Sequence, residues 1–161
     1  MFNANPKILP TPHSIEARHR ADLEEEDINV RPWDPGETHP TSSMPALQAA
    51  KCAQLQGEPA FIRFHIALFK AFFEESRNIS DRQVLLSLAK KAGLDVEKFI
   101  SDFDQGLTEK EVLAEYEEVQ AQYYGWGVPL AIVADRYPVM GASPIAVYRR
   151  AVDLSLASQS G

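Results

Sequence analysis

The sequence has very little cysteine: one residue, Cys52, in a chain of 161 residues. A lone cysteine excludes a disulfide within the chain and a zinc site built on cysteines. Cys52 lies in the stretch AAKCAQL, in the middle of a predicted helix and away from its start. We therefore expect a small packed side chain at this position, and the alternative is a reactive or intermolecular thiol.

The sequence also lacks clustered basic residues and long apolar runs. Its 16 lysines and arginines are scattered and are outnumbered by 23 acidic residues, which gives a formal net charge of -7. Because phosphate groups are bound by clustered Lys and Arg, we expect neither nucleic acid nor a membrane as a partner. No apolar run approaches the roughly 20 residues of a membrane span, and the first residues, MFNANPKILPTP, lack the apolar centre of a signal peptide. The sequence predicts a cytoplasmic protein.

Closely paired histidines are lacking as well. A metal site on a helix usually brings two histidines four residues apart, and His13, His19, His39 and His65 show no such spacing. We therefore expect no metal site, and nothing in the sequence indicates a cofactor. His65 falls among apolar residues of a Phe-rich segment, where a histidine at the boundary of the core is expected more often than a ligand.

Proline is unevenly distributed along the chain. Seven of the 11 prolines occur at or before Pro45, and between them lie the polar run HRADLEEED and the turn-rich run WDPGETHPTSS. Such composition is typical of loops. INVRPW, Ile28 to Trp33, is a weak strand candidate because it alternates poorly and meets Pro32. The sequence predicts an irregular segment over residues 1–44 and a folded region over residues 45–161.

Beyond Pro45 the sequence shows repeated helix start and stop signals. The predicted helices are Ala46 to Gln56, Pro59 to Glu75, Asp81 to Ala92 behind a capping box of Ser80 and Gln83, Asp95 to Gln105, and one that Thr108 and Glu111 begin. The second of them carries two apolar stripes, so we expect it to be buried on most sides. The two stripes are Phe61, Phe64, Leu68 and Phe72, and Ile62, Ile66, Phe69 and Phe73.

After Tyr124 the hydrophobic period changes from helical to alternating. Leu130 to Ala134 and Tyr137 to Met140 form a predicted hairpin around Asp135 and Arg136. A last helix follows Ser143 and Pro144, and we expect Ile145, Tyr148, Val152 and Leu156 to face inward. The predicted fold class is α+β and predominantly helical.

Two stretches resemble a known family. GWGVPLAIVADRYPVMGASPIAVYRRAV is similar to the carboxy-terminal part of DsbA-family thioredoxin-fold proteins, where a G-V-P loop leads into a hairpin and a closing helix. PALQAAKCAQLQGEPAFIRFHIALFKAFFEESRNISDRQVLLSLAKKAGLDVEKF looks like the helical insertion of the branch that holds FrnE-like oxidoreductases, chromene-carboxylate isomerases and kappa-class glutathione transferases. The resemblance covers Met44 to Ala157 and implies a DsbA-like thioredoxin fold with a helical insertion.

The resemblance also implies a substrate-binding loop. In such folds a cis proline, at the position that matches Pro129, lies against the redox motif, and the residue that matches Val128 pairs with an extended substrate. From the residues alone a trans proline in an ordinary loop is the commoner case. Trp126 beside this loop either lines a groove or packs as an aromatic residue. The candidate substrate-binding residues are Trp126, Gly127, Val128 and Pro129.

One feature of the family is missing from this chain. Relatives open with an apolar strand that leads to Cys-x-x-Cys, or a serine variant, at a helix amino terminus, where the thiol pKa is lowered. Met1 to Trp33 offer neither the strand nor a cysteine, so the chain resembles an amino-terminally truncated member without the first strands and the active-site helix. We therefore expect no catalytic residue and no dithiol activity in this chain.

Two functions stay open on this evidence. The first is a DsbA-like oxidoreductase seen through a shortened reading frame, acting on a protein or small thiol substrate at a groove closed by Val128 and Pro129. The second is a non-catalytic binding or assembly module, whose unpaired hairpin edge pairs with another copy or with a complementing chain. The resemblance does not choose among redox, isomerase and transferase chemistry, because these differ in the missing part.

Overall fold

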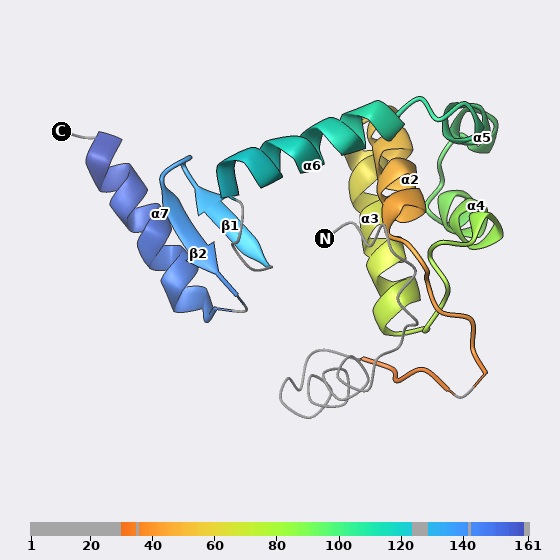
Figure 1. Ribbon diagram of the computed structural model, residues 1–161, viewed down its shortest axis with the longest axis horizontal. Helices are drawn as coiled ribbons and strands as arrows, with labels where there is room; N and C mark the ends of the chain where they lie inside the picture. Colours follow the sequence, from red (N-terminus) through yellow and green to blue (C-terminus); the bar gives the residue numbers. More distant parts are fainter. Residues whose placement is uncertain (1–29, 35, 124–128, 142, 160–161) are drawn as a thin grey trace. The chain divides into compact units, whose positions relative to one another are not determined.

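The computed structural model describes residues 30–34, 36–123, 129–141 and 143–159 (Figure 1). These residues form two compact units that divide between Tyr116 and Glu117. We call the described residues up to Tyr116 the helical unit and those from Glu117 onward the hairpin unit. The predicted boundary between residues 1–44 and 45–161 stays a prediction, since residues 1–29 lie outside the described residues.

The helical unit is a cluster of short helices around one apolar core. Its helices are α2 (Met44–Gln54), α3 (Glu58–Phe73), α4 (Arg82–Lys91), α5 (Val96–Asp104) and the beginning of α6 (Glu109–Tyr123). Helix α2 packs against α3, α4 and α5, and α4 packs against α3 and α5. Alanines on the buried side of α2 let these helices approach closely, and larger side chains from the others fill the centre. The fully buried residues include Ala49, Cys52, Ala53, Phe64, Leu85, Leu88 and Phe99.

Polar side chains fix where the helices begin. The Asp95 carboxylate accepts a hydrogen bond from the Lys98 backbone N–H at 3.0 Å, which confirms the predicted start of α5. The predicted capping box of α4 is wrong by one residue. Asp81 is the cap and accepts from the Gln83 N–H at 2.7 Å, while the Ser80 hydroxyl donates to Asn78 Oδ1. Asp81 takes this role because it has the extended backbone that a cap requires.

Helix α3 is buried on one side only, so the expectation of burial on most sides is wrong. Phe64 and Leu68 lie in the core, but the second predicted stripe is exposed, with Ile66 at 52% and Phe69 at 51%. The reason is that α2 and α4 both cover the same side of α3 within the helical unit. His65 is exposed, whereas the sequence predicted a place in the core or at its boundary, and its ring lies between those of Phe61 and Phe69.

The described residues that precede α2 are tied to the end of α3. The Arg31 N–H donates to the Phe73 carbonyl at 2.8 Å, and the Ser76 hydroxyl donates to the Arg31 carbonyl at 2.9 Å. Val30 is buried beside them. The described part of the weak strand candidate, residues 30–33, is therefore an irregular tether and forms no strand.

The hairpin unit contains two strands and a helix. Strand β1 (Leu130–Val133) pairs antiparallel with β2 (Tyr137–Met140), and α7 (Ile145–Gln159) packs against both. Ala134 and Asp135 both have positive φ, 52° and 53°, and the Arg136 N–H donates to the Val133 carbonyl across this turn. The predicted hairpin is confirmed, but its first strand ends at Val133, one residue earlier than predicted, because Ala134 is part of the turn.

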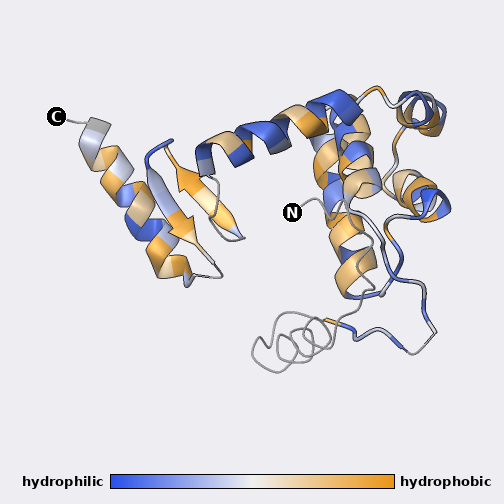
Figure 2. Ribbon diagram, viewed as in Figure 1, coloured by the Kyte–Doolittle hydropathy of each residue, from blue (hydrophilic) through white to orange (hydrophobic). Residues whose placement is uncertain are grey.

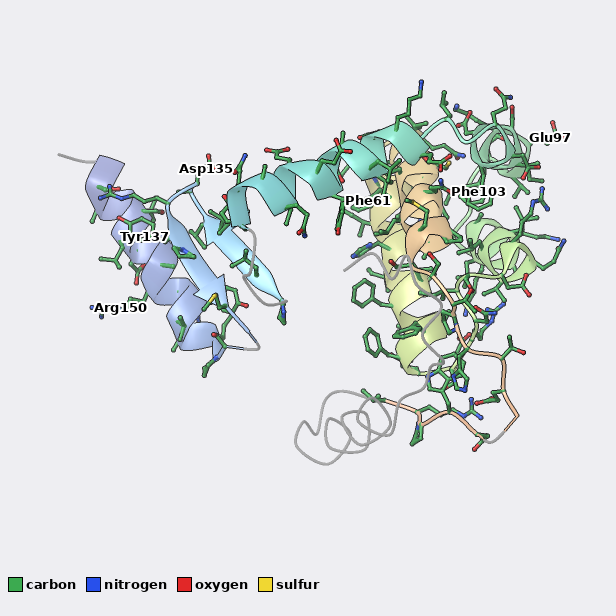
Figure 3. All side chains as sticks on the ribbon, viewed as in Figure 1. Phe61, Glu97, Phe103, Asp135, Tyr137 and Arg150 are labelled. Atoms are coloured by element: carbon green, nitrogen blue, oxygen red, sulfur yellow. The ribbon has the colours of Figure 1, made fainter. Side chains whose placement is uncertain are left out.

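The inward side of α7 differs from the prediction. Ala151 and Ser155 are buried, whereas Ile145 is 65% exposed and Val152 and Leu156 are exposed too. The small side chains let the helix lie close to the strands, and the Tyr137 hydroxyl on β2 donates to the Leu154 carbonyl of α7 at 3.4 Å (Figure 3). The predicted stripe was therefore wrong for three of its residues, and Tyr148 alone is half-buried.

Candidate functional site

Cys52 is enclosed and hydrogen-bonded inside the helical unit. It is the ninth of the 11 residues of α2 and has no exposed surface. Its Sγ lies 3.7 Å from the Thr108 Oγ1, and the Thr108 hydroxyl in turn donates to the Gln48 carbonyl at 3.1 Å. Because the hydroxyl has one proton and gives it to Gln48, the thiol is the donor to Thr108. This arrangement favours a protonated sulfur.

The electrostatics of Cys52 also favour the thiol over the thiolate. Burial raises the pKa of Cys52, the side-chain hydrogen bond between Cys52 and Thr108 opposes this in part, and the carboxylate of Asp102 raises the pKa further. Cys52 lies in the carboxy-terminal half of α2, where the helix dipole disfavours a negative charge. Cys52 is thus a packed residue and a poor nucleophile, as the sequence predicted.

Only one of the four candidate loop residues can be placed. Trp126, Gly127 and Val128 lie outside the described residues, so their grouping with Pro129 stays a prediction. Pro129 is exposed at the entrance to β1, and its carbonyl accepts a hydrogen bond from the Gly141 N–H at 2.8 Å. The proline thus lies at the open end of the hairpin, where the sequence placed it.

The register of the hairpin decides which backbone groups point outward. Since Gly141 donates to Pro129, these two residues form a hydrogen-bonded pair, and such pairs alternate along an antiparallel ladder. Ala131 and Val133 therefore turn their N–H and C=O groups toward β2. Leu130 and Ile132 turn theirs away from β2, and we call these outward groups the β1 edge.

The outer edge of β2 is obstructed. By the same alternation Pro138 and Met140 face outward there. Pro138 has no N–H to donate, and the Met140 carbonyl already accepts a hydrogen bond from the Ser143 hydroxyl at 2.8 Å. The β1 edge has no such obstruction, and in the described part of the chain no third strand pairs with it.

The asymmetry between the two edges was missed by the sequence reasoning, which noted only that an edge would lack partners. Pro138 in YPVM was the available signal. Its meaning depends on whether its nitrogen faces β1 or solvent, and that follows only from the register.

Over the described ranges the model shows no group of three histidine, cysteine or acidic side chains that could hold a metal ion. Among the same residues, no helix is both long and apolar enough to cross a membrane.

Comparison with known proteins identifies the family. A family model described as Thioredoxin matches residues 14–122, which is more than half of the chain. The chain belongs to the thioredoxin family. A crystal structure of a proposed protein disulfide isomerase from Nitrosomonas europaea superposes with a TM-score of 0.62 at 26% identity. That match covers 74% of this chain and 60% of the other, and it confirms the predicted DsbA-like thioredoxin fold.

Three curated relatives are described as the ClpXP adapter protein SpxH. The protein from Halalkalibacterium halodurans is 40% identical over 62 residues, which are 38% of this chain and 20% of that protein. Those from Shouchella clausii and Bacillus subtilis are 44% and 39% identical over 57 residues, 35% of this chain and 19% of each relative. The chain thus spans about a fifth of the length of these relatives.

Proposed function

We propose that this chain is a protein-binding module of thiol-disulfide oxidoreductase ancestry that performs no dithiol exchange itself. The observation that carries the proposal is the burial of Cys52, the one cysteine of the chain, which has no exposed surface and whose Sγ lies 3.7 Å from the Thr108 Oγ1. Dithiol exchange needs an accessible thiolate and a second thiol to resolve the mixed disulfide. This chain supplies neither.

The relatives suggest the kind of partner. Since three of them are ClpXP adapter proteins, we propose that this chain also binds ClpXP, in the cytoplasm, as part of an adapter role. In this proposal the loop from Trp126 to Pro129 and the open hairpin edge provide backbone groups for an extended partner segment. The net charge of -7 and the scattered basic residues support a protein partner over nucleic acid.

The absence of dithiol exchange is tested by the reduction of insulin disulfides with dithiothreitol. We expect the wild-type chain and Cys52→Ser to leave the uncatalysed rate unchanged, while a thioredoxin with an intact Cys-x-x-Cys accelerates it in the same plate. Catalysis by the wild-type chain that Cys52→Ser abolishes would overturn the proposal.

The adapter role is tested by direct binding. The purified chain is immobilised through an added terminal tag, and ClpXP from Bacillus subtilis is passed over it, with the SpxH protein of that organism as the positive control. We expect saturable binding. Binding of SpxH without binding of this chain would contradict the adapter role and leave the conclusion on dithiol exchange standing.

A second candidate function is disulfide exchange in a longer polypeptide that supplies a Cys-x-x-Cys strand. The structural match to the proposed disulfide isomerase favours it. The intact mass of the endogenous protein separates the two functions. A mass of 18.0 kDa supports the binding module, and a mass larger by several kDa supports the oxidoreductase.

A further inference from the structure

The β1 edge has the character of a strand from the middle of a sheet. All four residues of β1 are apolar and half-buried, and Figure 2 draws this strand in the colour of hydrophobic residues. Strands whose two faces are both apolar usually have neighbours on both sides. Here β2 occupies one side, so the other side is built to receive a further strand.

The β1 edge also lacks the features that usually protect an edge. Exposed edges are commonly blocked by a charged residue, a proline or a bulge. On β2 Pro138 serves in this way, but Leu130 to Val133 include no charge and no proline. The nearest charged residues in the sequence are Asp135 and Arg136, which lie in the turn beyond the strand. Figure 3 labels Asp135 at this turn.

The edge is complementary to itself. If β1 lies antiparallel to β1 of a second copy, Leu130 can stand opposite Ile132 of the partner subunit, and each such pair exchanges two hydrogen bonds because both residues face outward. Ala131 then faces Ala131 of the partner subunit on the twofold axis. That position brings side chains closest together, and alanine is small enough to fit it.

The side chains agree with this register. Ala131, Val133 and Val139 share the face that α7 covers, since Tyr137 on that face bonds to α7. Leu130 and Ile132 lie on the opposite face, and in a dimer they would join the same residues of the second copy in one apolar surface. No like charges meet across the axis, because β1 carries none.

We propose that this chain forms a twofold-symmetric dimer in which the β1 edges of two copies pair, giving one continuous four-stranded antiparallel sheet. Such an interface is closed and isologous, so it stops at two copies. The proposal rests on the binding role proposed for the hairpin edge, but it names a second copy of this chain, in place of a ClpXP segment, as the occupant of that edge.

The test is the mass of the full chain in solution, measured by light scattering after gel filtration with loadings from about 1 to 100 μM. We expect a mass twice 18.0 kDa at the upper concentrations. Ile132→Pro removes an outward N–H but none of the bonds between β1 and β2, just as Pro138 does on the other strand, and should return the mass to 18.0 kDa. Ile132→Lys, which keeps the backbone and adds a charge, should do the same.

The matched control is Met140→Lys, which places the same charge on the obstructed edge of β2 and should leave the dimer intact. Circular dichroism confirms that each variant is folded. A wild-type chain that stays monomeric at 100 μM overturns the dimer, as does a dimer that resists both Ile132 variants.

The result of the dimer test can be distinguished from the result of the ClpXP-binding test. A wild-type chain that is monomeric but still binds ClpXP would contradict the dimer and support the adapter role. If adding ClpXP to such a monomer protects the Leu130 and Ile132 amides from hydrogen exchange, the occupant of the edge is ClpXP. A chain that forms the dimer but does not bind ClpXP would support the pairing of the β1 edges and contradict the adapter role.

Discussion

Cys52 couples the stability of the helical unit to pH. Burial raises the pKa of its thiol in the folded chain above the value in the unfolded chain. Below about pH 8.5 the thiol is protonated in both states, so its full contribution to stability is present. At higher pH the unfolded chain loses the proton first, and the free energy of unfolding falls until the folded thiol also ionises.

We therefore expect the wild-type chain to lose stability relative to Cys52→Ser between about pH 8.5 and 10. Denaturant unfolding of both proteins at pH 7, 8.5 and 10 measures this difference, and other ionisations cancel in the comparison. A difference that stays constant over the whole range would show that the folded thiol titrates as in the unfolded chain.

Ala134 holds a backbone conformation that suits glycine better. Its φ of 52° lies in the left-handed region, which costs a residue with a Cβ about 1–2 kcal/mol. Ala134→Gly should stabilise the hairpin by roughly 0.5–1 kcal/mol after the entropic cost of glycine is subtracted. Hydrogen exchange of the Val133 and Val139 amides should slow about twofold to fivefold. Ala131→Gly, inside β1, is the control and should speed the same exchange.

At the scale of elements, Lys51 attaches the start of α6 to α2. Its Nζ lies 2.8 Å from the Glu111 carboxylate and also binds Glu115, and its side chain is 17% exposed. These two carboxylates raise the pKa of Lys51, Glu111 contributing most. Removing the lysine leaves two like charges four residues apart on one helix.

We expect Lys51→Ala to lower the free energy of unfolding by about 1 kcal/mol at low salt and by less in 1 M salt. Lys110→Ala removes an exposed lysine from α6 and should change stability by less than about 0.5 kcal/mol. Chemical unfolding at both salt concentrations measures these changes in the free energy of unfolding. Equal losses of stability for the two variants would argue against a stabilising role for the ion pairs of Lys51.

Much of the order of elements could be predicted from caps and periodicity, because Asp95, Pro59 and Gly93 act locally. Which stripe of a helix is buried could not, since the stripes of α3 and α7 are equally apolar and the choice depends on the neighbouring elements. Small residues such as Ala151 and Ser155 carry little hydropathy signal, yet they form the contact with the strands. The proposal that this chain performs no dithiol exchange could be made from the sequence, because a cysteine count needs no fold.

For the whole molecule, the core lies within one of the two units. Every residue of the main apolar cluster falls between Ala46 and Phe99. We expect a fragment of residues 30–116 to unfold cooperatively by circular dichroism, because it retains that cluster and the tether at Arg31 and Ser76. A fragment of residues 117–161 should unfold at a much lower temperature, since a hairpin with one helix is marginal. The opposite ranking of the two midpoints would contradict this division.

The position of Pro138 limits how the length of the hairpin can change during evolution. Its nitrogen faces away from β1 because Pro138 lies an odd number of residues, three, before Gly141, whose N–H faces β1. Inserting one residue between Pro138 and Gly141 would turn that nitrogen toward β1, where it cannot donate a hydrogen bond to the other strand. The insertion would also move the side chains on one side of it to the other face of the hairpin. Inserting two residues would restore the direction of the nitrogen and the faces of the side chains. Related sequences that keep this proline should therefore differ in length within β2 by even numbers of residues.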